Sequence, residues 1–138
     1  MAKDLEDFKI NVRLKLSALW TAVMFCYIYG DYFELYVPQK VAGLLDGKNM
    51  LDTPIKLFTA TFILTIPALL IFLSLMLSSK LTKWLNIGVG IFFTLFTFLV
   101  GISSISEWRM FYVFLSILES IITLTIVWQA WNWNRLKA

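Results

Sequence analysis

The chain of 138 residues contains no histidine and a single cysteine, Cys26. The lack of histidine excludes a histidine-ligated haem, the usual zinc sites and general-base catalysis by an imidazole. One cysteine permits neither a disulfide within the chain nor a Cys-x-x-Cys redox motif. Charged residues are also scarce, at 15%, whereas 59% of the residues are hydrophobic. Soluble domains carry roughly 25% charged residues, so the composition predicts an integral membrane protein.

Four apolar stretches are long enough to cross a membrane. A bilayer core needs about 20 mostly apolar residues per helix, and such stretches occur at about 14–32, 55–77, 84–105 and 110–131. Strands of a membrane barrel are about half as long and alternate in polarity, which these stretches do not. The sequence therefore predicts one all-α domain over 1–138, with four transmembrane helices in an up-down-up-down bundle.

Basic residues are distributed unevenly between the two sides of this arrangement. Eight of the 12 lie in the N-terminal arm, in the connection at 80–83 and at the C-terminus. The positive-inside rule then predicts that both termini are cytoplasmic. We attribute the net charge of +3 to contact with anionic lipid headgroups rather than with nucleic acid.

Two segments outside the spans are expected to lie on the membrane surface. The arm before the first span has helical spacing around Phe8 and Val12, although residues 8–16 also alternate as a strand would. We favour an interfacial helix that leads into the first span. Residues 38–45 carry a short apolar face and predict a helix of one or two turns, lying flat over the outer end of the bundle as a lid.

Glu119 is the one charged residue inside the fourth span, near the bilayer midplane. An acid at this depth costs roughly 2.5–3.5 kcal/mol on insertion scales, and such residues usually face the bundle interior. No basic residue lies at the same depth, so we expect Glu119 to be protonated. It would then donate to a hydroxyl or to the Ile63 carbonyl. That carbonyl lacks its usual partner because Pro67, four residues later, has no backbone N–H. Two roles stay open for Glu119: a structural hydrogen bond between helices, or a site that binds a ligand or carries a proton.

Further polar side chains are expected near Glu119 or at the outer end of the spans. Some share its helical face, and others lie at similar depth in neighbouring spans. The outer tyrosines form either an interfacial belt or one wall of an outward-facing pocket. The predicted ligand-binding or proton-carrying residues are Glu119, Tyr112, Ser116, Ser120, Thr123, Thr21, Thr65, Asp31 and Tyr29.

Two carboxylates, Asp31 and Glu34, close the first span. One interpretation makes them solvated groups at the interface, paired with Lys56 or Arg109. The other makes them a mouth that attracts cations above the tyrosines. The sequence leaves both open.

Several stretches form a recognisable combination. Residues 11–33 read NVRLKLSALWTAVMFCYIYGDYF, the second span contains Pro67, residues 83–86 read KWLN, and the helix with Glu119 ends in tryptophan-rich sequence. In these features the chain resembles an uncharacterised bacterial family of small four-helix membrane proteins, over nearly its whole length. The resemblance implies a protein of the bacterial inner membrane, and it supplies no catalytic residue because the family has no assigned activity.

These observations favour a non-enzymatic membrane protein that binds a small amphiphile, a lipid or a partner helix within the bundle. The alternative is a small proton-coupled transporter that uses Glu119. Small multidrug exporters are similar in size, helix number and possession of a membrane glutamate, but they carry that acid on the first helix. We expect the bilayer and a hydrophobic small molecule as partners. We expect no cofactor, metal or catalytic residue, since no nucleophile–base pair is recognisable, and homo-oligomerisation is left open.

Overall fold

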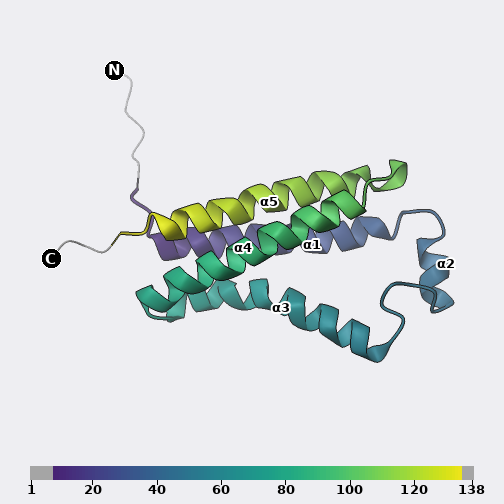
Figure 1. The fold of residues 1–138 in the computed structure, drawn as a ribbon, viewed down its shortest axis with the longest axis horizontal. Coiled ribbons are helices and arrows are strands. Elements are labelled where there is room, and N and C mark those ends of the chain that lie inside the picture. Colours follow the sequence, from purple (N-terminus) through teal and green to yellow (C-terminus); the bar gives the residue numbers. More distant parts are fainter. Residues whose placement is uncertain (1–7, 135–138) are drawn as a thin grey trace, which may run out of the picture.

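The computed structural model describes residues 8–134 and shows four long helices that run alternately up and down (Figure 1). These helices are α1 (Val12–Glu34), α3 (Pro54–Met76), α4 (Ser79–Ser103) and α5 (Met110–Trp131). The connections hold the short α2 (Lys40–Leu45) and a 3-10 helix, η1 (Glu107–Arg109). All four long helices have the length and apolar character needed to span a membrane. The predicted fold class is confirmed, and residues 8–134 contain no strand.

The two ends of the bundle differ. Residues 8 and 134 lie at one end, which we call the terminal end, and α2 lies at the other, which we call the α2 end (Figure 1). At the terminal end α1 begins at Val12, because the side chain of Asn11 accepts a hydrogen bond from the Arg13 amide at 2.9 Å. Residues 8–11 are not helical. The expected interfacial helix is therefore wrong for these residues, and the rest of that arm, residues 1–7, lies outside the described part.

The core forms where α1 packs against both α3 and α5, while α4 packs along α5. Glycines allow the second contact to be close. A Cβ atom added to Gly90 would lie 2.7 Å from Cγ2 of Val127, and one added to Gly101 would lie 2.9 Å from Cβ of Ser116. Small residues at such positions let helix backbones approach each other, and packing between helices is a main source of stability in lipid.

A buried polar cluster joins three helices near the terminal end. The indole of Trp20 donates to Oδ1 of Asn86 at 2.7 Å. The amide of Asn86 in turn donates to the Thr82 carbonyl at 2.8 Å and to Oγ of Ser74 at 3.2 Å. Asn86 is fully buried, so these bonds satisfy groups that lipid could not. The cluster therefore ties α1, α3 and α4 together.

Two cations cap helix ends at the terminal end. The guanidinium of Arg13 donates to the carbonyls of Leu75 and Leu77, at 3.1 and 2.7 Å, where α3 ends. The ammonium of Lys83 donates to the Trp131 carbonyl, where α5 ends, at 3.0 Å. Cations are stabilising at helix C-termini because the last carbonyls carry partial negative charge. These two side chains thus fix the ends of α3 and α5.

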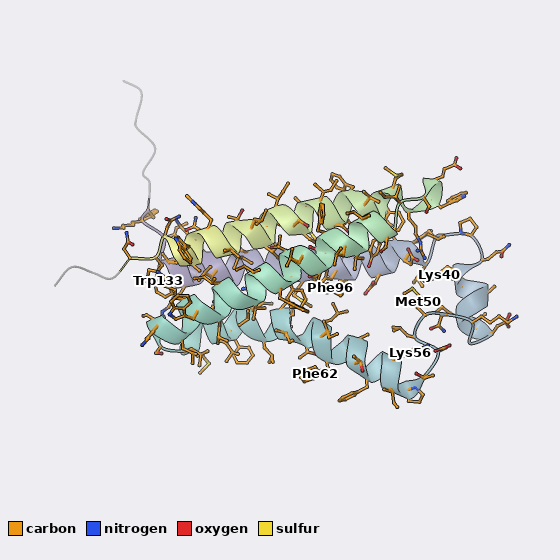
Figure 2. All side chains as sticks on the ribbon, in the orientation of Figure 1. Lys40, Met50, Lys56, Phe62, Phe96 and Trp133 are labelled. Carbon is orange, nitrogen blue, oxygen red and sulfur yellow. The ribbon has the colours of Figure 1, made fainter. Side chains whose placement is uncertain are left out.

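The N-terminal half of α3 leans away from the other helices (Figure 1). The buried residues of α3, namely Pro67, Leu70 and Ser74, all lie in its second half, whereas residues 54–59 are exposed. Phe62 lies on the outer side of α3, while Phe96 of α4 lies toward the space that the lean opens (Figure 2). Pro67 stands between the two halves, and a proline inside a helix removes one backbone hydrogen bond and favours a bend.

The predicted short helix is present as α2, at the end of the bundle away from the termini. Figure 1 shows α2 beyond the ends of α1 and α3, and none of its residues is buried. Because α3 leans outward, the connection between α1 and α3 must cross a wider gap, and α2 occupies that crossing. The expected short helix at the outer end is thus present, and its role as a lid stays a prediction.

Ion pairs gather at the α2 end. Glu34 accepts from Arg109 at 2.5 Å and from Lys40 at 3.1 Å. The expected pairing of Glu34 with Arg109 is confirmed. Lys56 pairs instead with Asp52, one helical turn away, at 2.6 Å.

Candidate functional site

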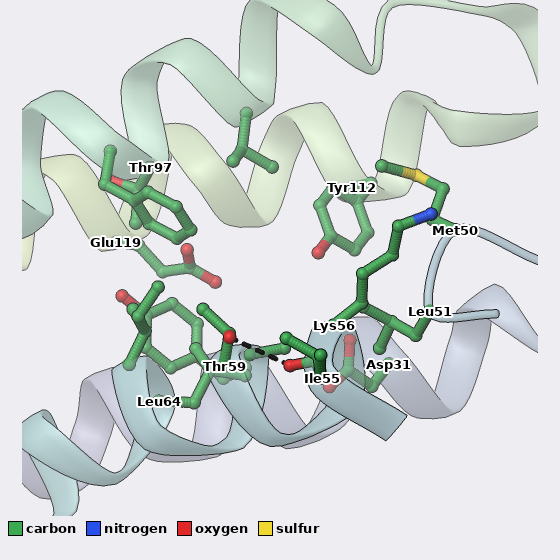
Figure 3. A pocket seen from close by; sticks show the side chains of 15 residues that line it. Asp31, Met50, Leu51, Ile55, Lys56, Thr59, Leu64, Thr97, Tyr112 and Glu119 are labelled. Carbon is green, nitrogen blue, oxygen red and sulfur yellow. Dashed lines mark hydrogen bonds between the residues drawn. The ribbon is translucent and has the colours of Figure 1, made fainter. Parts of the chain in front are cut away.

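A cavity of about 440 Å³ lies between the leaning half of α3 and the helices α1, α4 and α5 (Figure 3). It extends from the middle of the bundle to the connection that precedes α3. Its lining is mostly apolar and aromatic, with a few polar groups. The lining residues are Tyr27, Asp31, Met50, Leu51, Ile55, Lys56, Thr59, Ala60, Ile63, Leu64, Phe96, Thr97, Val100, Tyr112 and Glu119.

The carboxyl group of Glu119 faces this cavity (Figure 3). The residue is only 6% exposed, yet its carboxyl makes no hydrogen bond to any residue in the range 8–134. The expected bond to a hydroxyl or to the Ile63 carbonyl is not formed. The lean of α3 accounts for this, because it places Ile63 on the far wall of the cavity instead of against α5.

Some of the other polar groups of the lining already have partners. The hydroxyl of Thr59 donates to the Ile55 carbonyl at 2.8 Å, and that of Thr97 to the carbonyl of Phe93 at 2.8 Å. The hydroxyl of Tyr27 is buried and has no partner among the described residues. A ligand in the cavity would therefore find four groups without a partner among the described residues: the carboxyls of Asp31 and Glu119 and the hydroxyls of Tyr27 and Tyr112.

Three of the predicted site residues line the cavity, namely Asp31, Tyr112 and Glu119. Three others face α4 instead. Ser120 bonds with the Thr97 hydroxyl at 3.0 Å, and Thr123 accepts from Thr94 at 2.8 Å. Ser116 lies against Gly101 and donates to a carbonyl of its own helix at 2.8 Å. These hydroxyls hold α4 and α5 together and leave Glu119 to the cavity.

The last three predicted site residues lie apart from the cavity. The hydroxyls of Thr21 and Thr65 donate to carbonyls four residues earlier in their own helices, at 2.9 and 2.8 Å. Thr65 is also exposed on α3. Tyr29 is 52% exposed and stacks between two phenylalanines on the outer face of α1.

Several lining residues were not predicted, because they depend on the lean of α3. Lys56, Thr59 and Ala60 belong to the leaning half, and Met50 and Leu51 to the connection before it. The sequence signal for them was Pro67 in the middle of an apolar span. That proline was interpreted only as the cause of a free carbonyl, and not as the boundary between a packed and an unpacked half.

The lining residues have the chemistry needed to recognise a ligand. Within the described range no three histidine, cysteine, aspartate or glutamate side chains come together as metal ligands. A buried carboxyl, a buried phenol and aromatic walls can accept hydrogen bonds and hold an apolar body. The cavity thus suits a molecule with an apolar part and one polar group.

Comparisons with known proteins address the family. No curated protein and no solved structure matched this chain. The motifs at 11–33 and 83–86, with Pro67 and Glu119, resemble an uncharacterised family of membrane proteins, and a family model confirms this likeness. It matches residues 4–138 and is described as a family of unknown function (DUF6326), so the chain belongs to that family.

Proposed function

We propose that this membrane protein binds a small amphiphile in the cavity, with Glu119 contacting the polar group of the ligand. One observation carries the proposal: Glu119 is a residue only 6% exposed, and its carboxyl faces about 440 Å³ of space and has no partner among residues 8–134. An unsatisfied buried polar group costs roughly 1–3 kcal/mol or more. A ligand that bonds to Glu119 would offset this cost, and acids within a membrane are functional candidates by default.

The size of the cavity favours a small amphiphile over a partner helix. A helix about 10 Å wide that rises 5.4 Å per turn would fill about 440 Å³ with a single turn. A lipid chain or a small molecule fits this volume better, and ligand pockets commonly measure roughly 300–1,000 Å³. The proposed activity is binding and includes no catalytic step. The bilayer is the proposed surrounding partner.

Filling the cavity tests this proposal. Ala60 lines it from α3, so Ala60→Phe should occupy part of the space. Dodecylamine, dodecanol and dodecanoate serve as probes, each added separately to purified protein. For each probe that binds wild type, we expect Ala60→Phe to reduce the affinity by about tenfold or more. Native mass spectrometry of the complexes measures the bound fraction.

The matched control is Ala18→Phe, since Ala18 lies on an exposed face of α1. It should bind the three probes as wild type does. Equal binding by Ala60→Phe and Ala18→Phe, or binding of none of the probes by wild type, would contradict the proposal.

We further propose that the protein lies in the bacterial inner membrane with the terminal end in the cytoplasm. The family resemblance supports the bacterial membrane, and charge supports the orientation. The described residues at the terminal end include five basic residues and no acidic one: Lys9, Arg13, Lys15, Lys80 and Lys83. At the α2 end, three of the four cations are paired with acids. An excess of lysine and arginine is typical of the cytoplasmic side.

Cysteine labelling tests the orientation. In a Cys26→Ser background, a cysteine at Lys48 should react with an impermeant thiol reagent added outside intact cells. A cysteine at Lys80 should react only after the cells are broken. Both positions are exposed, so accessibility within the protein does not limit the reaction. The reverse pattern would contradict the proposed orientation.

Proton-coupled transport is the second candidate, and the same carboxyl favours it. A carboxyl that faces a cavity can exchange a proton with the contents of that cavity, whereas one bonded between helices cannot do so freely. Asp31 and Tyr112 also line the cavity, between Glu119 and the α2 end. They would mark a route toward the aqueous phase.

A further inference from the structure

The charged groups around the cavity are unbalanced. Glu119 and Asp31 both line it, and Lys56 is the cation of the lining. The ammonium of Lys56, however, lies 2.6 Å from a carboxylate oxygen of Asp52. The nearby cations Arg109 and Lys40 are held by Glu34, so each of these three cations already has an acid as its partner.

The two carboxyls of the lining have no such partner among the described residues. Figure 3 shows Glu119 and Asp31 at opposite sides of the cavity, with Asp31 nearer the α2 end. An amphiphile with a carboxylate or phosphate head would meet two acidic groups and no cation free to pair with it. A cationic head would meet acids at both places.

Aromatic rings add to this preference. Tyr27, Tyr112 and Phe96 line the cavity from α1, α5 and α4. The faces of such rings attract organic cations, by roughly 0.5–2 kcal/mol per contact depending on solvation. The Tyr27 hydroxyl is buried without a partner and can accept an N–H bond.

We infer that the ligand is an organic ammonium: an amine, protonated at neutral pH, on an apolar body. Its N–H groups donate to the Glu119 carboxyl and the Tyr27 hydroxyl. The bound cation favours the ionised form of Glu119, which is neutral without it, so that the acids of the lining balance the charge of the ligand. Ile55, Leu64 and Val100 contact the apolar body. This inference rests on the proposed function and names the chemical class of its ligand.

Three amphiphiles with the same chain separate the head groups. Dodecylamine is cationic at pH 7, dodecanol is neutral and dodecanoate is anionic. Native mass spectrometry of purified protein in an uncharged detergent should show that wild type binds dodecylamine about tenfold or more tightly than dodecanol, with dodecanoate weakest. A desolvated pair between the ammonium of dodecylamine and the Glu119 carboxylate accounts for a difference in affinity of at least that size.

Substitutions then locate the preference. Glu119→Gln keeps the shape of the side chain but removes the acid, so the advantage of dodecylamine over dodecanol should fall to about twofold or less. Glu107→Gln is the matched control, because Glu107 is an exposed acid outside the cavity, and it should retain the full preference.

The outcomes distinguish this inference from the proposed function. Equal binding of dodecylamine and dodecanol by wild type, or tighter binding of dodecanoate, overturns the ammonium inference but leaves amphiphile binding in place. A preference that persists in Glu119→Gln also overturns it. If Glu119→Gln does not fold, Asp31→Asn takes its place and should reduce the preference by about threefold or more. Failure of every probe to bind wild type contradicts the proposed function as well.

Discussion

Leucine in place of Gly90 is expected to lower the stability of the bundle by about 2 kcal/mol or more, whereas leucine in place of Gly88 should have little effect. A Cβ atom at Gly90 would already lie 2.7 Å from Val127 and 3.5 Å from the Thr123 carbonyl. Leucine adds three further carbons to that contact, so α4 and α5 must separate. Gly88 has no such neighbour within 4 Å and is exposed.

The pair of variants is matched, because both glycines lie in the same part of α4 and receive the same side chain. Each variant is heated in detergent, and gel filtration then measures the fraction that stays monodisperse at each temperature. The two resulting Tm values are compared. Gly90→Leu should lose roughly 5 °C or more in Tm relative to Gly88→Leu. Equal Tm values would show that α4 and α5 do not depend on this close contact.

Glu119→Leu is expected to raise stability by about 1 kcal/mol or more while it abolishes ligand binding. The carboxyl has no partner among residues 8–134, so leucine removes a buried polar group and loses no bond. A structural role for Glu119 predicts the opposite sign. Thr123→Val is the control, because Thr123 does bond across to Thr94 at 2.8 Å. It should lose about 0.6 kcal/mol.

The Tm of each variant, measured without added ligand, decides between these signs. A lower Tm for Glu119→Leu than for wild type would show that Glu119 holds the helices together. Glu119→Gln then separates binding from transport. In vesicles with an imposed pH gradient, proton-coupled transport requires a flux in wild type that Glu119→Gln abolishes although it folds normally. Binding alone gives no flux in either protein.

Apolar length predicted the four long helices because lipid enforces helical structure on such segments. The same rule identified Glu119 as a candidate site residue, because an acid within an apolar span carries a high cost whichever way its side chain faces. The rule does not report how helices sit against one another. The lean of α3 and the resulting cavity depend on packing on both sides of Pro67, so the contributions of Ala60 and Thr59 could not be derived from spacing.

Helical period also limited the prediction of the site. Ser116, Ser120 and Thr123 repeat on the same side of α5 as Glu119, and the period alone does not separate the part of that side that faces α4 from the part that faces the cavity. The glycines of α4 decide this, because Gly90 and Gly101 bring α4 close to that row. A pattern on one helix therefore had to be combined with a pattern on another.

Asn86 was noted only as part of a sequence motif, although it is fully buried and bonds to two other helices. It lies close to the start of its span, where polar residues commonly face water or headgroups, so its position gave no sign of burial. Its partner Trp20 was likewise noted only as part of the motif at 11–33. Only the crossing of α1, α3 and α4 brings the two side chains together.

The bond between Trp20 and Asn86 also dictates an order of events during biosynthesis. The two residues are 66 positions apart, and ribosomes add about 5–20 residues per second, so roughly 3–13 seconds separate their synthesis. Throughout that interval the nascent first helix carries an indole N–H without its final acceptor. This tertiary contact therefore closes only after the third long helix has emerged from the ribosome.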